Sequence, residues 1–405
     1  MRCLIFAEDY LPNIGGIASH VHKLALSLQR TGNDVHVMTV RKLPRGRNLR
    51  VCRSREIERD GLPITEIPVI YSPRNILLPF QKQFIFAKQA RNYIKNNKVD
   101  VFHWHNIYFD PDVARKVNGT TGMVFTNHSS QFLAAATQGD AERSHLFHTL
   151  NYAHQIIAPS EQLLESTFDL GYPRNRGSYI PNGVDTDQFS PNENVRQTTR
   201  RQLNIQPHET VILCARRIVE KCGIVYFAKA LRRLQNVQNL VVLLTGFSGR
   251  LTWRDHEYES LVLEELEHLP SGIRVVKLGH VPSDDMPSYY RAADFCVLPS
   301  LVEATSIAGL ESMASGVPLI GTNVGGIPAI IQNDFDGLLV SAKDPHALEQ
   351  AIRVMIDAPE KRRAMGDRAR EAAISRFSWD IISRKTAEIY ERASEEFKKS
   401  GPVKV

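Results

Sequence analysis

Short runs of apolar, often β-branched residues recur along the first 130 residues, separated by longer segments with helical periodicity. The runs RCLIFA, DVHVMTV, DVFHWH and GMVFTN each predict a buried strand. Between the first two, residues 17–30 place Val21 and three leucines near one face and end before Gly32, which predicts a helix. Strands that alternate with helices form βαβ units, so this half of the chain predicts a parallel sheet.

The same alternation starts again in the second half. Strands are predicted at TVILCAR, NLVVLLTG, RVVKLG, DFCVLP, VPLIGT and GLLV, with helices between several of them, the first at residues 226–234. A strand, QIIAPS, and a helix, EQLLESTFDLG, precede the turn-rich segment IPNGVDTDQFSPNEN, where we place the linker. We therefore expect an α/β fold of two doubly wound domains, which implies a cleft and ligands outside the carboxyl ends of the strands.

The last predicted helix, FSWDIISRKTAEIYERASEEF, carries an apolar stripe. Ile381, Ile382, Ala387 and Tyr390 lie roughly on one face, so the helix should pack on one or both domains. No repeat with a period of 20–50 residues is present, which excludes solenoids and propellers.

Composition agrees with two ordinary globular domains. The 405 residues are too many for one core, and 42% hydrophobic with 23% charged residues argues against disorder or a coiled coil. No window approaches the ~18 apolar residues of a membrane span, and Glu8 and Asp9 interrupt the first strand too soon for a signal peptide. The five cysteines are scattered, without a CxxC pair, so we expect no disulfides, no cysteine zinc site and a cytoplasmic protein.

The net charge of +6 is concentrated in one place. The stretch from Arg41 to Arg59, which we call the basic stretch, holds eight Lys or Arg residues and two Glu. It is either a solvated loop or a contact for anionic lipid headgroups at the inner membrane face. It has no interleaved aromatic residues, so we expect no nucleic-acid partner.

Two glutamates flank a predicted helix start after the strand DFCVLP. If the helix begins near Thr305 or Ser306, Glu303 lies in the loop before it and Glu311 lies inside it. The free amides at Ser306 and Ile307 would then bind an anion such as a diphosphate. Carboxylates beside them suit a sugar or ribose, because an ionised carboxylate only accepts hydrogen bonds. Without further context, two solvated glutamates on a surface helix would explain the spacing.

This segment, with ASGVPLIGTNVGGIPAII after it, resembles the donor-binding signature of the family 4 retaining glycosyltransferases. Further similar segments are YLPNIGGIASHVHKLALSLQRTGNDVHVMTV, VFTNHSS, IPNGVDTDQFSP, ARRIVEKCG and FSWDIISRKTAEIY, so that the resemblance covers nearly all of residues 1–395. It implies the GT-B architecture, two facing Rossmann-like domains with an interdomain cleft. The implied domains are an acceptor-side domain at 1–190, a nucleotide-sugar domain at 191–376, and a helix at 377–405 that returns to the first.

The resemblance also implies roles for single residues of the first domain. Gly15 and Gly16 would let the backbone approach the donor diphosphate and the sugar, as glycine permits, although a plain turn is the alternative. His128 would lie near the transferred sugar. His103 and His105 share a strand face, so a metal pair is conceivable, but packing beneath the cleft is the simpler explanation.

In the second domain, the resemblance assigns Arg216 and Lys221 to the departing diphosphate. Cations there would stabilise the charge that develops on the leaving oxygen. Arg217 is the adjacent alternative to Arg216, and Cys222 stands where many relatives continue directly to glycine. Val281, in the loop GHVPS, is expected near the nucleotide base.

DxD pairs occur at Asp110 and Asp112, at 185 and 187, and at 334 and 336. In a different transferase fold such a pair holds a metal, but here each lies in a turn-like stretch. We interpret them as chance matches and expect neither a metal nor another cofactor.

The resulting hypothesis is a retaining transferase that moves a hexose-type sugar from a nucleotide diphosphate, with UDP the commonest in the family and GDP next, to an acceptor hydroxyl. The acceptor, whether small molecule, glycan or lipid-linked, stays open. A sugar-nucleotide epimerase and a phosphorylase-like enzyme of the same fold are alternatives, and a non-catalytic sugar-nucleotide-binding protein is another.

Overall fold

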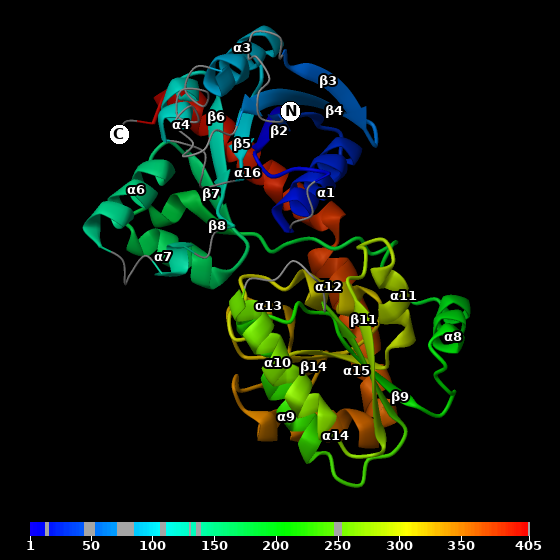
Figure 1. Ribbon diagram of the computed structural model, residues 1–405. Coiled ribbons are helices and arrows are strands. Elements are labelled where there is room, and N and C mark those ends of the chain that lie inside the picture. Colours follow the sequence, from blue (N-terminus) through cyan, green and yellow to red (C-terminus); the bar gives the residue numbers. More distant parts are fainter. Residues whose placement is uncertain are drawn as a thin grey trace. The chain divides into compact units, whose positions relative to one another are not determined.

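The chain divides into two compact units. The first unit is formed by two separate stretches of the sequence, and the second by one continuous stretch. The computed structural model describes residues 1–12, 16–43, 53–70, 85–105, 111–128, 131–134, 139–246 and 253–403. Unit 1 comprises Met1–Asn182 and Trp379–Val405, and unit 2 comprises Gly183–Ser378 (Figure 1). The boundaries expected from the sequence were after residues 190 and 376.

Unit 1 is built on an eight-stranded sheet in the order β3-β4-β2-β1-β5-β6-β7-β8. The chain runs from β1 outward to one side and then crosses to β5 on the other, so the strand order reverses between β1 and β5. All pairs are parallel except β3 with β4. The strands are β1 Arg2–Ala7, β2 Asp34–Leu43, β3 Arg55–Arg59, β4 Leu62–Ile70, β5 Val101–Trp104, β6 Gly122–Thr126, β7 Gln155–Ala158 and β8 Gly177–Tyr179.

Helices α1 and α16 pack on this sheet from opposite ends of the sequence. The helical segments of unit 1 are α1 Gly16–Arg30, α3 Ala87–Asn97, α4 Pro111–Val117, α5 Gln131–Ala134, α6 Asp140–Leu150, α7 Glu161–Asp169, the short η5 Arg174–Arg176 and α16 Trp379–Ser400. Helix α16, red in Figure 1, buries Ile382, Ile389 and Tyr390 in the same core as β1 and α1. Ile381 and Ala387, expected on the buried stripe, are only partly buried.

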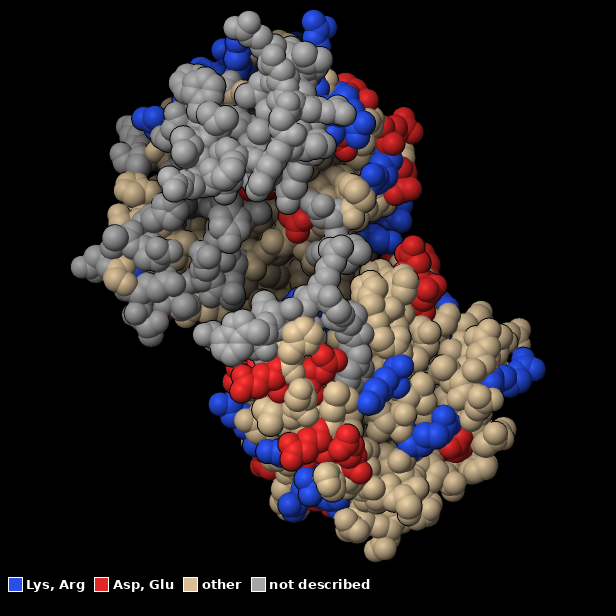
Figure 2. Space-filling model, viewed as in Figure 1, with Lys and Arg blue, Asp and Glu red and all other residues tan. Residues whose placement is uncertain are grey.

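The basic stretch is not simply a loop, as the sequence had suggested. Strand β2 extends to Leu43, and β3 forms an antiparallel pair with β4 at the edge of the sheet. Arg41 Nε and Arg55 Nε lie 3.9 and 2.5 Å from Glu66 Oε2, so this carboxylate offsets part of the positive charge. Residues 44–52 lie outside the described residues. On the face drawn in Figure 2, acidic and basic side chains of the described residues are interspersed.

Unit 2 holds a six-stranded, fully parallel sheet in the order β11-β10-β9-β12-β13-β14. The strands are β9 Thr210–Cys214, β10 Leu240–Thr245, β11 Ile273–Gly279, β12 Phe295–Leu298, β13 Leu319–Thr322 and β14 Gly337–Val340. The order 3-2-1-4-5-6 is that of a doubly wound sheet, and its direction reverses between β9 and β12. Ligands of such sheets bind outside the carboxyl ends of the strands at that switch point.

Apolar cores fill both faces of this sheet, which is why its strands are nearly continuous hydrophobic runs. The helical segments are α8 Glu193–Gln202, η6 Glu220–Cys222, α9 Ile224–Arg233, α10 Trp253–Glu267, α11 Met286–Ala292, α12 Ile307–Ala314, α13 Ile327–Ile330, α14 Pro345–Asp357, α15 Pro359–Ala372 and η7 Ala373–Phe377. Helix α8 is tied to the start of β12, because Arg196 and Arg200 donate to the two oxygens of Asp294 at 2.6 and 2.7 Å.

The predicted fold class is therefore confirmed: two α/β domains with parallel sheets. Within the described part of the chain, no helix is both long enough and apolar enough to cross a membrane.

Candidate functional site

The loops that follow β9 and β12 meet at the switch point of unit 2. The Lys221 carbonyl accepts hydrogen bonds from the amides of Leu301 and Val302, at 2.8 and 3.3 Å. Gly223 makes this contact possible: its φ is +68°, and a Cβ there would lie 1.9 Å from the Pro299 carbonyl oxygen. A larger residue would force the two loops apart.

Arg216 and Glu303, which the sequence predicted as separate parts of a substrate site, form an ion pair with each other. Both side chains are mostly buried, with exposed fractions of 15% and 14%. Burial acts most strongly on the pKa of Arg216 and lowers it, but Glu303 together with the thiols of Cys222 and Cys214 outweighs burial, and the pKa is raised. Arg217 is exposed instead, so the geometry favours Arg216 over its neighbour as the cation of the site. The Lys221 side chain is exposed.

Two adjacent glycines hold the backbone of Glu303. Gly325, with φ +54°, would place a Cβ 1.6 Å from the Glu303 carbonyl oxygen, and the Gly326 amide donates to that oxygen at 3.2 Å. No role was predicted for this pair, although two adjacent glycines in the loop shortly after the strand VPLIGT are a signal of close backbone approach. They are positioning residues that the sequence reasoning missed.

Helix α12 begins where the sequence predicts, beside Glu303. Ser306 is its N-cap: the side-chain oxygen accepts from the Gly309 amide at 3.1 Å, and Ile307 is the first helical residue. The first amides of a helix have no partner within the helix, so those of Ile307 and Ala308 stand at its open, electropositive end. This geometry suits an anion such as a diphosphate.

Glu311 lies one turn into α12 and is paired with a residue that was not predicted. The Tyr290 hydroxyl, from α11, lies 3.0 Å from Glu311 Oε2, to which it donates, and 3.1 Å from the Ala308 carbonyl oxygen. Burial raises the pKa of Glu311 to about 7, and the Tyr290 hydrogen bond offsets part of that rise. Val281 lies, partly buried, in the loop between β11 and α11.

Buried polar atoms without partners mark the same edge of the sheet. Among the described residues, none forms a hydrogen bond with Arg216 Nε or with Ser300 Oγ, although both atoms are shielded from solvent. Buried polar atoms are nearly always satisfied in folded proteins, so such orphans call for an explanation. A bound polar ligand at the β9 and β12 loops would provide one.

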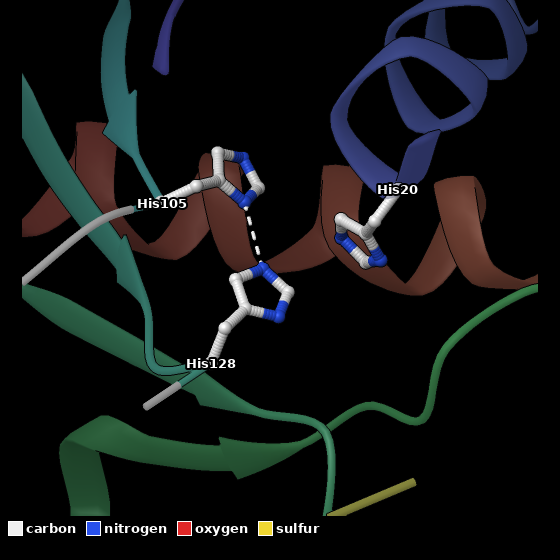
Figure 3. A group of neighbouring side chains, drawn as sticks. All are labelled: His20, His105 and His128. Atoms are coloured by element: carbon white, nitrogen blue, oxygen red, sulfur yellow. Dashed lines mark hydrogen bonds between the residues drawn. The ribbon is translucent and has the colours of Figure 1, made fainter. Parts of the chain in front are cut away.

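In unit 1, three histidines converge at the carboxyl ends of the strands (Figure 3). His128 follows β6, His105 follows β5, and His20 projects from α1. His105 Nδ1 lies 3.1 Å from His128 Nε2, and the His20 ring meets the His128 ring edge-on, with centroids 4.6 Å apart. Gly16 is the exposed first residue of α1, and Gly15 lies outside the described residues.

The three imidazoles are held in their neutral forms. Burial lowers the pKa of His20 to about 4, and burial together with the neighbouring imidazoles holds the pKa of His105 and of His128 well below the usual value. All three are therefore uncharged near neutral pH. His20 was not singled out by sequence reasoning, because one histidine in an amphipathic helix gives no distinct signal.

His103 and His105 do not form the metal-binding pair that was considered from the sequence. His103 uses both ring nitrogens, bonding the Tyr390 hydroxyl and the Thr126 hydroxyl at 2.7 Å each. It is thus a satisfied core histidine, as packing beneath the strand ends would require. His105 points to a different partner.

Within the described residues, His20, His105 and His128 are the group whose ligand atoms could hold a metal ion, with these atoms within 4.8 Å of one another. Neutral imidazoles suit zinc, copper or nickel rather than magnesium. However, His105 and His128 already share a hydrogen bond, and no carboxylate belongs to the group. The fit to a resident ion is therefore poor.

Two of the DxD pairs have structural partners. Asp185 accepts from the amides of residues 187 and 188, at 3.3 and 3.0 Å, which closes a turn. Asp336 accepts from the Gln332 amide at 2.6 Å, and Asp334 pairs with Lys361 at 2.5 Å. Asp110 lies outside the described residues.

Comparison with known families covers both units. Residues 14–188 match the model of Glycosyltransferase Family 4, and residues 195–372 match that of Glycosyl transferases group 1. The chain belongs to the family 4 glycosyltransferases. The resemblance noted in the sequence is thereby confirmed.

Relatives of this glycosyltransferase extend over different shares of its length. It is 26% identical over 408 residues to an uncharacterized glycosyltransferase of Methanocaldococcus jannaschii, covering 98% of this chain and 99% of that protein. It is 34% identical over 216 residues to a D-inositol 3-phosphate glycosyltransferase of Corynebacterium kroppenstedtii, covering 52% of this chain and 47% of that one. The second match therefore spans about half of each protein.

Solved structures establish the GT-B fold of this transferase. Sucrose-phosphate synthase from Thermosynechococcus elongatus superposes with a TM-score of 0.77 at 23% identity, covering 99% of this chain and 100% of that one. Anabaena HepE in complex with UDP-glucose superposes with a TM-score of 0.73 at 16% identity, covering 96% and 99%.

Proposed function

We propose that this glycosyltransferase is a retaining enzyme that moves a hexose-type sugar from a nucleotide diphosphate to an acceptor hydroxyl. The observation that carries the proposal is the grouping at the β9 and β12 strand ends of unit 2. A cation, Arg216, an open helix end at Ile307, and two carboxylates, Glu303 and Glu311, lie on one edge of one sheet. These are the groups that a diphosphate and two sets of neighbouring hydroxyls require.

In this proposal, binding of the donor breaks the ion pair between Arg216 and Glu303. The diphosphate takes Arg216, with Lys221 and the α12 amides completing its contacts, and Glu311 accepts hydrogen bonds from the ribose. Glu303, released from Arg216, holds sugar hydroxyls and stabilises positive charge at the anomeric carbon. Preorganised cations in a site shielded from water stabilise the charge that develops on the leaving phosphate.

His128 is proposed to contact the sugar that is transferred, with the backbone at Gly16 approaching it closely. The leaving phosphate accepts the proton of the acceptor hydroxyl on the same face as the new bond forms, so the anomeric configuration is retained without a separate strong base. A double displacement through Glu303 is the alternative. It predicts a covalent sugar adduct on that carboxylate, which mass spectrometry of the intact protein would detect.

UDP is the proposed donor nucleotide, with GDP next. This choice is supported at the level of fold by the Anabaena neighbour, whose structures hold UDP and UDP-glucose. The proposal for the acceptor side is an anionic contact at the basic stretch, with an acceptor phosphate or with lipid headgroups at the inner membrane face. No metal or cofactor has a part in the proposed reaction.

The test is transfer by wild-type protein and by Glu303→Ala, after a screen of nucleotide sugars for protection against thermal unfolding. Glu303→Ala should bind the nucleotide and lose at least a hundredfold in transfer, since it removes a group that contacts the reacting sugar. Glu360→Ala, at an 83% exposed side chain, is the matched control and should be fully active. Near-normal transfer by Glu303→Ala would contradict the proposed role.

The same experiment separates the alternatives. An epimerase would convert the donor without an acceptor, and a sugar-nucleotide-binding protein would bind it without turnover. Proton NMR of the product decides the stereochemistry, because retention and inversion give different anomeric couplings. An inverted product would exclude the retaining mechanism but not the transfer.

A further inference from the structure

We propose that His105 is a positioning residue for His128: it donates Nδ1–H to His128 Nε2 and so holds His128 in the tautomer that carries its proton on Nδ1. The inference rests on the proposed function insofar as the contact between His128 and the sugar is itself proposed. The hydrogen bond between the two rings does not depend on that function.

The contact between the rings allows two arrangements. His105 Nδ1 and His128 Nε2 are 3.1 Å apart, a hydrogen-bond distance that needs one proton between them (Figure 3). A neutral imidazole has one donor and one acceptor nitrogen. Either His105 donates from Nδ1, or His128 donates from Nε2. An imidazolium would also supply the proton, but burial disfavours the charged form of both rings.

The far nitrogen of His105 distinguishes the two arrangements. His105 is 1% exposed, and its Nε2 has no hydrogen-bond partner among the described residues. If His128 donated, the proton of His105 would have to stand on that Nε2, as a buried N–H without an acceptor. If His105 donates, only a lone pair is left there. Orphaned buried donors are rarer in proteins than under-satisfied acceptors, so the structure favours donation by His105.

The His20 ring packs against the same pair of rings. Its ring meets the His128 ring edge-on and lies 5.5 Å from the His105 ring, centroid to centroid. His20 is buried and faces the same pair without hydrogen-bonding to either ring among the contacts of the described residues, so it walls the pair off from water rather than competing for its proton. His128 alone of the three is partly exposed.

The tautomer decides what His128 can do to a substrate. With Nε2 occupied by His105 and the proton on Nδ1, the free side of the ring offers a hydrogen-bond donor and no lone pair. His128 would then hold a hydroxyl oxygen of the sugar but could not remove a proton from the acceptor. This agrees with a reaction in which the leaving phosphate takes that proton. It also predicts that kcat does not fall at low pH through protonation of His128, because His128 does not act as a base.

Two variants of His105 test the inference. In His105→Asn, the side-chain Nδ2 stands near the place of the imidazole Nδ1 and can still donate, whereas His105→Phe fills the space without a donor. The tautomer of His128 is measured by 15N chemical shifts in protein labelled at histidine, with His128→Gln identifying the signal. His208→Asn, at an exposed histidine, is the matched control.

We expect wild type and His105→Asn to show His128 protonated on Nδ1, and His105→Phe to shift it to a mixture of tautomers. Transfer by His105→Phe should fall about tenfold or more in kcat with little change in KM, because a lost orienting hydrogen bond acts on the transition state. His105→Asn should recover most of that loss.

A wild-type His128 protonated on Nε2, or an unchanged tautomer in His105→Phe, would overturn the inference. If the wild-type protein failed to transfer sugar, the proposed function would fail while the tautomer measurement still decided the role of His105. If His105→Phe did not fold, the wild-type tautomer and the kinetics of His105→Asn would decide it.

Discussion

Ionisation of the Glu311 carboxyl group, which the proposed ribose contact requires, should lower the free energy of unfolding of the protein. Burial raises its pKa to about 7, from 4.5, although the Tyr290 hydroxyl donates to it. The ribose contact proposed above requires the ionised form, because a protonated carboxyl presents one acceptor fewer. Replacing Glu311 by Gln keeps the shape and removes the titration.

The sign of the effect on stability follows from linkage. The folded state binds this proton more tightly than the unfolded state, so the contribution of Glu311 is most favourable below pH 4.5 and is lost as the pH rises through about 7. The full shift, from 4.5 to about 7, corresponds to at most about 3–4 kcal/mol, because one pKa unit is about 1.4 kcal/mol. The free energy of unfolding of Glu311→Gln, relative to that of wild type, should therefore increase as the pH rises from 5 to 8.

Donor binding should show the opposite dependence. A ligand that binds only the ionised form loses about tenfold in affinity between pH 8 and pH 6 if the free carboxyl has a pKa near 7. Glu311→Gln should bind more weakly at pH 8, and its affinity should depend little on pH. A nucleotide sugar is the suitable ligand, because its diphosphate has no proton to lose in this range.

Urea unfolding at pH 5, 6, 7 and 8 measures the first effect, and calorimetric titration with the nucleotide sugar measures the second. Glu360→Gln, at an exposed side chain, is the control and should run parallel to wild type. A stability difference between Glu311→Gln and wild type that is the same at all four pH values would refute the reasoning.

Three further outcomes are expected. Asp294→Ala should lower the free energy of unfolding by about 3–5 kcal/mol in urea titrations, because two arginines, one of them buried, lose their shared carboxylate; Asp294→Asn should lose less, and equal losses would contradict the ion pairing. Gly325→Ala should reduce transfer at least tenfold while the protein stays folded by circular dichroism, because its Cβ would lie 1.6 Å from the Glu303 carbonyl oxygen and displace that residue; Gly139→Ala, whose Cβ would have no atom of the described residues within 4 Å, is the control, and equal activity of the two would speak against the role of Gly325. Dialysis against EDTA should leave transfer unchanged; activity lost on dialysis and restored by added zinc or magnesium would reverse the expectation of a metal-free reaction.

Most of the parallel strands of both units could be predicted because they are buried on both faces and therefore form nearly continuous apolar runs. Strand β4, with the sequence LPITEIPVI, is parallel to β2 and was not predicted. Strand β3, with the sequence REIER, escaped prediction because an edge strand exposes charged side chains, which made it part of an apparently basic loop. Strand β8 has three residues, which is too short for any periodicity to be visible.

The candidate site was predictable where one segment carries several of its groups, as around Glu303 and Glu311. It was not predictable where a group acts through a partner distant in sequence. Tyr290 meets Glu311 through the packing of α11 on α12, and His20 meets His128 through the packing of α1 at the strand ends. The two-residue period placed His103 and His105 on one face, but only tertiary contacts separate the satisfied core histidine from the one that faces His128.

The position of α16 has a consequence for the order in which the protein can fold during synthesis. The ribosome completes all of unit 2 before it makes residues 379–405, yet these residues belong to the core of unit 1. Tyr390 bonds His103 there, and the α16 backbone at Ala393 lies so close to β6 that a Cβ on Gly122 would be 2.8 Å from it. Domains generally fold as units while the chain emerges. The core of unit 1, most of which is synthesised first, therefore cannot be completed until unit 2 has been synthesised and α16 follows it.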